Sequence, residues 1–224
     1  MGNNKVLNDM SEELLKASSI YHPSDFWTRL NGIHKNQLTS AGFNNFKRSI
    51  NMKYFNWGIL GILAQQGHLI IQQIKKGNLD PIFRSNFTNY KSKSNLKVYK
   101  FNPISAFIYR VFTASYMDYL LKIDRDSIIK KMDEPIIGNP FLISYKNKKV
   151  SQDLCNSIHE FYSITEFLGK KENLRILEIG AGYGRLAYIF LDQLVNASYC
   201  IIDIPPALFI AQKYLTEVFP KEKI

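Results

Sequence analysis

Three glycines, Gly180, Gly182 and Gly184, stand between an apolar segment and a segment with helical spacing. Residues 175–179 read RILEI, which is typical of a short strand buried in a parallel sheet. Residues 185–194 have the pattern of a helix. Glycines allow a sharp turn and a close approach of the backbone to a ligand, and the amides at the start of the next helix then face that ligand. The sequence therefore predicts a strand, a ligand-binding turn and a helix.

The same order of elements is repeated once, towards the end of the chain. Residues 199–202 form a second apolar segment, and residues 207–219 a second helical one. This order favours a parallel, doubly wound sheet. The predicted fold class is therefore α/β, with a partial Rossmann-like domain (its first two parallel strands and their helices) preceded by a mainly helical N-terminal region. We expect residues 1–150 to form the helical region, for substrate or interaction, and residues 151–224 the Rossmann-like part.

Apolar spacing and capping residues upstream of the strands predict several helices and one hairpin. Ser151 is expected to cap a helix that continues to about Phe167, because Leu154, Ile158 and Phe161 give it an apolar face. The other expectations are a helix start at 10–13, a short capped helix at 24–27, long apolar helices near 56–75 and 104–122, a shorter helix near 126–132, a polar loop over 78–99 and a hairpin over 141–150.

The spacing of the glycines distinguishes two cofactors. A dinucleotide-binding turn needs its third glycine at position 185, where this chain has Arg185. The chain instead reads E-x-G-x-G-x-G from Glu178 to Gly184, which resembles the first motif of class I S-adenosylmethionine-dependent methyltransferases. Asp203 follows the second strand, nineteen residues after Gly184, where a carboxylate can accept hydrogen bonds from both ribose hydroxyls. Together these signals predict S-adenosyl-L-methionine as the cofactor.

Longer segments resemble a narrower family, the sugar O-methyltransferases of bacteria. The similarity is carried by EIGAGYGRLA at 178–187, YCIIDIPPAL at 199–208 and AQKYL at 211–215. Upstream it includes FW at 26–27, NFKR at 45–48, YFNW at 54–57, GNPF at 138–141 and SQD at 151–153. The resemblance touches most of the chain, and within it the glycine motif is specific for the cofactor. It implies O-methyl transfer to a sugar hydroxyl, on a glycan or a nucleotide sugar, as in polysaccharide biosynthesis.

The resemblance also implies a cofactor site and a mechanism. Ile204, after Asp203, would pack on the adenine. The acceptor oxygen would attack the methyl carbon directly and lose a proton to a general base. No residue is assigned as that base; His159 and Glu160 lie on the helix before the first strand, but a histidine there is more often a surface or fully hydrogen-bonded residue. The expected cofactor-binding residues are Glu178, Gly180, Ala181, Gly182, Tyr183, Gly184, Asp203 and Ile204.

In the family that the chain resembles, this domain contains more strands than the two that the chain supplies. Because two parallel strands with exposed edges form a marginal sheet, we expect an incomplete methyltransferase. Two alternatives stay open. The first is a non-catalytic truncated product whose helical region serves as an interaction module. The second is a nucleotide-dependent oxidoreductase, against which Arg185 argues.

Charge and composition limit the kinds of partner that we expect the chain to bind. The net charge is +10, and residues 171–224 carry six basic and six acidic side chains, so the whole excess lies in residues 1–170. No run of Lys and Arg resembles a nucleic-acid patch, so no nucleic acid is expected. Polar side chains interrupt both long apolar segments, which argues against a stable membrane span. Histidines and cysteines show no metal-ligand spacing, and the cysteine content fits a reducing cytoplasm.

Overall fold

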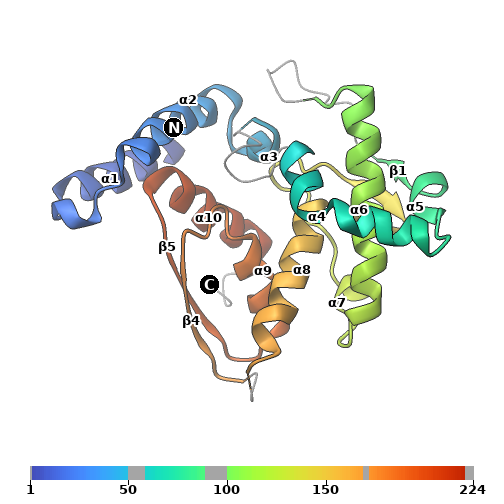
Figure 1. Cartoon of the computed structure of the whole chain (residues 1–224). Coiled ribbons are helices and arrows are strands. Elements are labelled where there is room, and N and C mark those ends of the chain that lie inside the picture. The colour runs from blue at the N-terminus through green and yellow to red at the C-terminus, as the bar shows by residue number, and fades with distance from the viewer. Residues whose placement is uncertain (1, 50–58, 89–99, 169–171, 220–224) are drawn as a thin grey trace. The chain divides into compact units, whose positions relative to one another are not determined.

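The chain is an α/β structure with mostly helices and a few strands (Figure 1). It divides into two compact units. Residues 1–43 and 170–224 form the first, which we term the parallel-sheet unit, and residues 44–169 form the second, the helical unit. The computed structural model describes residues 2–49, 59–88, 100–168 and 172–219.

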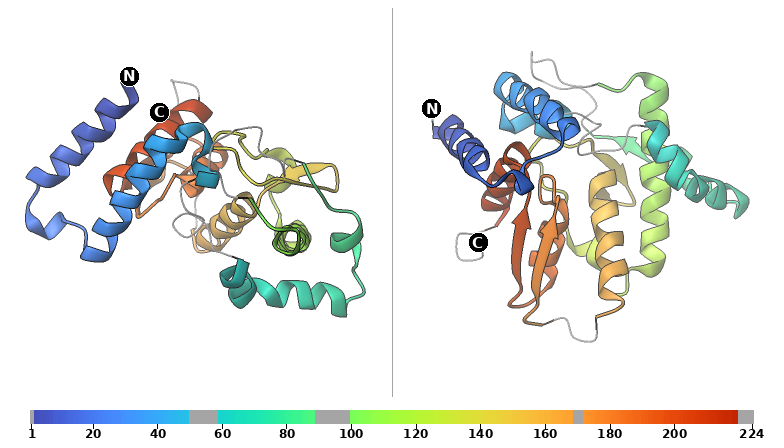
Figure 2. Two further views of the ribbon diagram at one scale, coloured as in Figure 1. Left: turned by 90° about the horizontal axis from the view of Figure 1, so that it is seen from above. Right: turned by 60° about the vertical axis from the view of Figure 1, so that its left-hand side comes forward.

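Two parallel strands form the sheet of the parallel-sheet unit. β4 (Arg175–Ile179) and β5 (Ser198–Ile202) pair along their whole length. α9 (Arg185–Gln193) connects them, and α10 (Pro205–Val218) follows β5. The two strands run side by side in the right view of Figure 2. The predicted order of strand, turn, helix, strand and helix is confirmed, and each bound lies within two residues of the expected one.

One face of this sheet packs against α9, and the other is largely apolar and exposed. The ring of Phe190 in α9 lies 5.9 Å from that of Tyr199, which marks the covered face. Side chains alternate along the strands, so Leu177, Ile179 and Ile202 share the opposite face. Their exposed fractions are 60%, 78% and 52%. The described residues thus leave one apolar side of β4 and β5 uncovered.

Two long N-terminal helices complete the parallel-sheet unit. Their bounds are Gly2–Lys16 for α1 and Asp25–Ala41 for α2, with the short 3-10 turn η1 (Ser19–Tyr21) between them. Both pack against α10. The predicted helix start near Ser11 is wrong, because the Ser11 hydroxyl donates to the Leu7 carbonyl inside α1 instead of capping an end. The second predicted helix is much longer than expected, because nothing stops it before Gly42, where φ is 72°.

The helical unit is built around α6 (Pro103–Ile123). Its N-cap Asn102 accepts a hydrogen bond from the Ser105 amide, and a proline suits the first helical position. Large side chains such as Phe112 and Tyr116 are buried on it, so α6 lies at the centre of this unit. The other elements are α3 (Phe46–Ser49), α4 (Ile59–Lys75), α5 (Asp80–Phe83), α7 (Ile128–Lys131), α8 (Gln152–Thr165) and an antiparallel sheet of β1 (Asn86–Phe87), β2 (Ile143–Tyr145) and β3 (Lys148–Val150). The short 3-10 turn η2 (Phe43–Asn45) lies at the boundary between the two units in the sequence.

Most sequence predictions for the helical unit are confirmed. The hairpin turns at Lys146 and Asn147, whose φ values are 48° and 60°, as a two-residue turn requires. Ser151 caps α8, with its hydroxyl accepting from the Leu154 amide at 3.0 Å. The polar loop over 78–99 contains α5 and β1, and its last part lies outside the described residues. Over the described ranges, no helix combines the length and apolar character needed to cross a bilayer.

The boundaries of the two units differ from the domain boundary that the sequence predicts at residue 150. The sequence assigns α8 to the same domain as β4, but α8 packs in the helical unit against α6 and α7. The reason is its apolar face, where Leu154, Ile158 and Phe161 are all buried. Conversely, the first 43 residues belong with the strands, because α1 and α2 pack against α10.

Candidate functional site

The glycine turn between β4 and α9 has three residues in left-handed backbone conformations. The φ angle is 79° at Gly180, 63° at Gly182 and 81° at Gly184. The Gly180 amide continues the parallel ladder by donating to the Ile202 carbonyl, 2.8 Å away. A Cβ atom at Gly180 would meet no atom within 4 Å, so open space lies in front of the turn. This combination permits a ligand to approach the backbone closely.

The other side of the turn is packed against α10. A Cβ atom at Gly184 would lie 3.2 Å from Leu215 Cδ1. Ala181 and Tyr183 are buried, and the Tyr183 ring meets the Tyr214 ring edge-on at 5.3 Å. The side chain of Tyr183 therefore holds the turn against α10 and is not available to a ligand. The backbone of the turn is the part that can contact one.

Asp203 joins the end of β5 to the glycine turn. Its Oδ2 accepts a hydrogen bond from the Gly182 amide at 2.8 Å, and its Oδ1 accepts one from the Ile204 amide at 2.7 Å. Burial raises the pKa of the Asp203 carboxyl, while the two amide hydrogen bonds act in the opposite direction. Each carboxylate oxygen has capacity for a further hydrogen bond. Asp203 can thus receive two hydroxyl groups on neighbouring carbon atoms.

Glu178 is held within the sheet. Its Oε2 accepts a hydrogen bond from the Tyr199 hydroxyl at 2.8 Å. The strand register places both side chains on the half-buried face of β4 and β5. The structure therefore brings Gly182, Asp203 and Ile204 together as the sequence predicts, and it places Glu178 with a tyrosine of the neighbouring strand.

His159 belongs to α8 of the helical unit and is hydrogen-bonded there. Its Nδ1 lies 2.9 Å from the hydroxyl oxygen of Tyr116, and that hydroxyl donates to Asn156 Oδ1 at 3.0 Å. Burial lowers the pKa of His159, and the neighbouring Glu160 partly opposes that shift. This agrees with the expectation of a hydrogen-bonded histidine, and the geometry gives no reason to assign His159 as the general base.

A cavity of about 400 Å³ lies beside the start of α10 and is not predicted by the sequence. Asn31 and Lys35 of α2 contribute to its lining. They stand four residues apart, on one face of a helix. This spacing indicates a shared helix face only if residues 25–41 form one long helix. The sequence predicts a helix only over residues 24–27, so it does not bring Asn31 and Lys35 together.

The described site is thus a glycine turn whose amide at Gly182 is bound by Asp203, at the edge where two parallel strands end. Its open backbone and its carboxylate suit a ligand that carries neighbouring hydroxyl groups. Within the described ranges, no three side chains of His, Cys, Asp or Glu gather in a position to hold a metal ion. The chain matches no protein-family model, no curated protein and no solved structure at a significant level.

Proposed function

We propose that the chain binds S-adenosyl-L-methionine at the glycine turn and belongs to a Rossmann-like methyltransferase that modifies a sugar hydroxyl. The observation that carries the proposal is the hydrogen bond between Asp203 and the Gly182 amide. It places a carboxylate and a left-handed glycine turn at one edge of a parallel sheet, where open α/β sheets bind their ligands.

Each residue of the site has a part in this proposal. Asp203 accepts hydrogen bonds from the two ribose hydroxyls, and Gly180 leaves room for the ligand beside the backbone. Ile204 is half-buried and packs on the adenine. Gly184 and Tyr183 hold the turn against α10. The bound cofactor supplies an electrophilic methyl group, and the site residues hold it in line with the acceptor oxygen.

The resemblance to sugar O-methyltransferases supports the choice of acceptor. Its motifs at 45–48, 138–141 and 151–153 come from distant parts of the sequence, and hydrogen bonds join them in the helical unit. Glu134 links the first motif to the third, because its carboxylate contacts Lys47 Nζ at 2.7 Å and accepts from the Ser151 hydroxyl at 2.5 Å. Asn139 Nδ2 donates to Asn45 Oδ1 at 3.0 Å, and Arg48 Nε donates to the Asn139 carbonyl at 2.8 Å. A shared network explains why these motifs occur together in one chain.

A non-catalytic interaction module is the second candidate function. The observation that favours it is the uncovered apolar face of β4 and β5, with Leu177 and Ile179 more than half exposed. An apolar patch of this kind commonly marks a contact with another protein. Cofactor binding distinguishes the two candidates, because an interaction module has no need of it.

The substitution Asp203→Asn is expected to weaken binding of S-adenosylhomocysteine about 10- to 100-fold, because hydrogen bonds to a charged acceptor contribute about 1.5–3 kcal/mol. Asparagine keeps the size of the side chain and one acceptor oxygen, which can accept from one of the two backbone amides. Asp192→Asn is the matched control, since Asp192 is exposed on α9 and accepts a hydrogen bond only from the adjacent Gln193 among the contacts described. Calorimetric titration measures both affinities. Equal affinities for the two variants would contradict the assigned role of Asp203.

Acidification is expected to weaken S-adenosylhomocysteine binding at a higher pH than an ordinary aspartate would require. Binding uses the ionised carboxylate, and burial raises the pKa of Asp203. For folding the sign is opposite: a raised folded-state pKa means that this carboxyl favours folding below its unfolded pKa and loses that contribution as pH rises through its folded pKa. Titrations over a pH series test the binding effect, and Asp203→Asn should abolish it. If the affinity of the Asp203→Asn variant depends on pH in the same way as the affinity of the unchanged chain, this assignment is contradicted.

A further inference from the structure

The cavity of about 400 Å³ lies in the parallel-sheet unit, between α1, α2 and the start of α10. This volume falls in the range of small-molecule sites. Pro205 and Pro206 form part of its wall and directly follow Asp203 and Ile204 in the chain. Because β4 and β5 are parallel, the glycine turn and the start of α10 lie at the same edge of the sheet. The cavity is therefore at the end of the unit where we place the cofactor.

The cavity combines apolar walls with a few polar groups. Leu14 and the two prolines supply apolar surface, while Asn31 supplies an amide. The Oδ1 atom of Asn31 is buried and has no hydrogen-bond partner among the described residues. An unpaired buried acceptor is costly, so a ligand that donates a hydrogen bond to it is favoured. A hydroxyl group on the ligand meets this need.

The charge of the lining favours an anionic ligand. Lys35, which lines the cavity, carries a positive charge. None of the residues described as lining the cavity is acidic. A concave site lined by one sign of charge attracts a ligand of the opposite sign. Phosphate, which is common on small metabolites, is the anionic group that a lysine holds readily.

We propose that this cavity binds a phosphorylated sugar, the acceptor whose hydroxyl is methylated. Asn31 accepts a hydrogen bond from a ring hydroxyl, Lys35 pairs with the phosphate, and the C–H face of the ring lies on Leu14 and the prolines. The role of the ligand as acceptor rests on the proposed function. The binding of the ligand does not, because it requires no cofactor.

Gly32 allows the cavity to be filled with little disturbance of the fold. It lines the cavity from α2, and a Cβ atom at this position would meet nothing within 4 Å. A leucine there also removes the helix-weakening effect of glycine. Gly67→Leu is the matched control, because Gly67 is also helical, belongs to α4 of the helical unit, and has no atom within 4 Å of a built Cβ.

The test is calorimetric titration of the whole chain with hexose 1-phosphates, and separately with uridine diphosphate glucose, free glucose and inorganic phosphate. We expect saturable binding of a hexose 1-phosphate or of the nucleotide sugar, with glucose and phosphate at least about tenfold weaker. The two phosphorylated arms distinguish a sugar monophosphate from a nucleotide sugar. Gly32→Leu and Lys35→Gln should each weaken that binding at least about tenfold, and Gly67→Leu should leave it unchanged.

Titration of the same variants with S-adenosylhomocysteine separates this proposal from the proposed function. Loss of sugar-phosphate binding in Gly32→Leu with retained S-adenosylhomocysteine binding supports the cavity. No saturable binding of either phosphorylated sugar at millimolar concentration, or equal binding by Gly32→Leu and the unchanged chain, overturns it. Failure of the unchanged chain to bind S-adenosylhomocysteine instead overturns the proposed function, and the sugar-phosphate result then still decides the cavity.

Discussion

Replacing Lys47 with methionine is expected to lower the free energy of unfolding by about 3–5 kcal/mol, because it leaves a buried carboxylate without its partner. Lys47 Nζ and Glu134 Oε1 lie 2.7 Å apart, and the two side chains are 2% and 3% exposed. The other oxygen of Glu134 accepts a hydrogen bond from the Ser151 hydroxyl at 2.5 Å. Chemical denaturation followed by circular dichroism measures the loss.

Two control variants show whether the loss of stability comes from the unpaired, buried carboxylate of Glu134. Lys16→Met breaks the ion pair of Lys16 with Glu13, whose side chains are 68% and 75% exposed, and should cost less than about 1 kcal/mol. The double substitution Lys47→Met with Glu134→Leu removes both buried charges and should recover most of the lost stability. If Lys47→Met costs no more than Lys16→Met, the pair is not buried in solution.

Gly138→Ala is expected to destabilise the helical unit by about 2–5 kcal/mol. The φ angle of Gly138 is 80°, which costs a residue with a Cβ atom about 1–2 kcal/mol. That Cβ would also lie 2.7 Å from Cδ1 and Cζ of the buried Phe46 ring, and forced packing of this kind adds about 1–3 kcal/mol. Thermal and chemical denaturation measure the change in stability.

Gly77→Ala is the control for Gly138→Ala. Gly77 belongs to the same unit and has a φ angle of 70°, but a Cβ atom there would meet nothing within 4 Å. It should therefore show the backbone cost alone, about 1–2 kcal/mol. Equal losses for the two variants would mean that Phe46 does not pack against Gly138.

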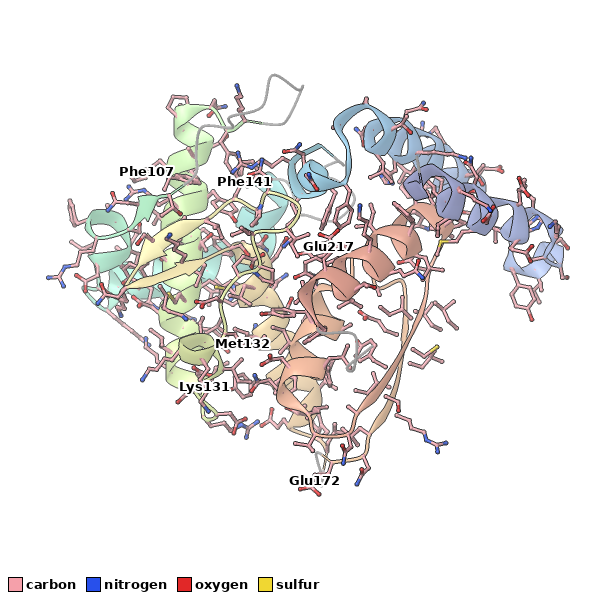
Figure 3. The ribbon with its side chains drawn as sticks, turned by 180° about the vertical axis from the view of Figure 1, so that it is seen from behind. Phe107, Lys131, Met132, Phe141, Glu172 and Glu217 are labelled. Atoms are coloured by element: carbon pink, nitrogen blue, oxygen red, sulfur yellow. The ribbon has the colours of Figure 1, made fainter. Side chains whose placement is uncertain are left out.

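Both predictions concern contacts between segments that are far apart in the sequence. The Lys47 amide donates to the Gly138 carbonyl at 3.0 Å, and the guanidinium of Arg48 lies 4.3 Å from the centre of the Phe141 ring, which is labelled in Figure 3. The motifs that contain these residues are visible in the sequence, but periodicity and spacing say nothing about which of them meet. A single sequence therefore identifies the segments, and only the structure shows which of them are in contact.

Elements with local signals are predicted well. The run at 175–179 becomes β4, and the hydroxyl of Ser151 caps α8. The long α2 is not predicted, because its sequence is polar and its apolar positions, such as Leu38 and Ala41, are few. The packing of α8 in the helical unit is not predicted for a similar reason, because an apolar helix face shows that a helix is buried and does not show against which element.

The candidate site is predicted in part for the same reason. Asp203 and the glycine turn come from the ends of adjacent parallel strands, so topology alone brings them together. The hydrogen bond of Glu178 with Tyr199 depends on strand register, which the sequence does not specify. The cavity requires the packing of α1 and α2 against α10, and no motif encodes that contact.

Calorimetric titration of the whole chain with S-adenosylhomocysteine, in parallel with NADH, tests the central claim most directly. We predict saturable binding of S-adenosylhomocysteine with one ligand per chain and no saturable binding of NADH, because Arg185 stands where a dinucleotide turn needs glycine. A folded chain that binds NADH tightly, or that binds neither ligand, would contradict the assignment of the glycine turn and Asp203 to S-adenosylmethionine.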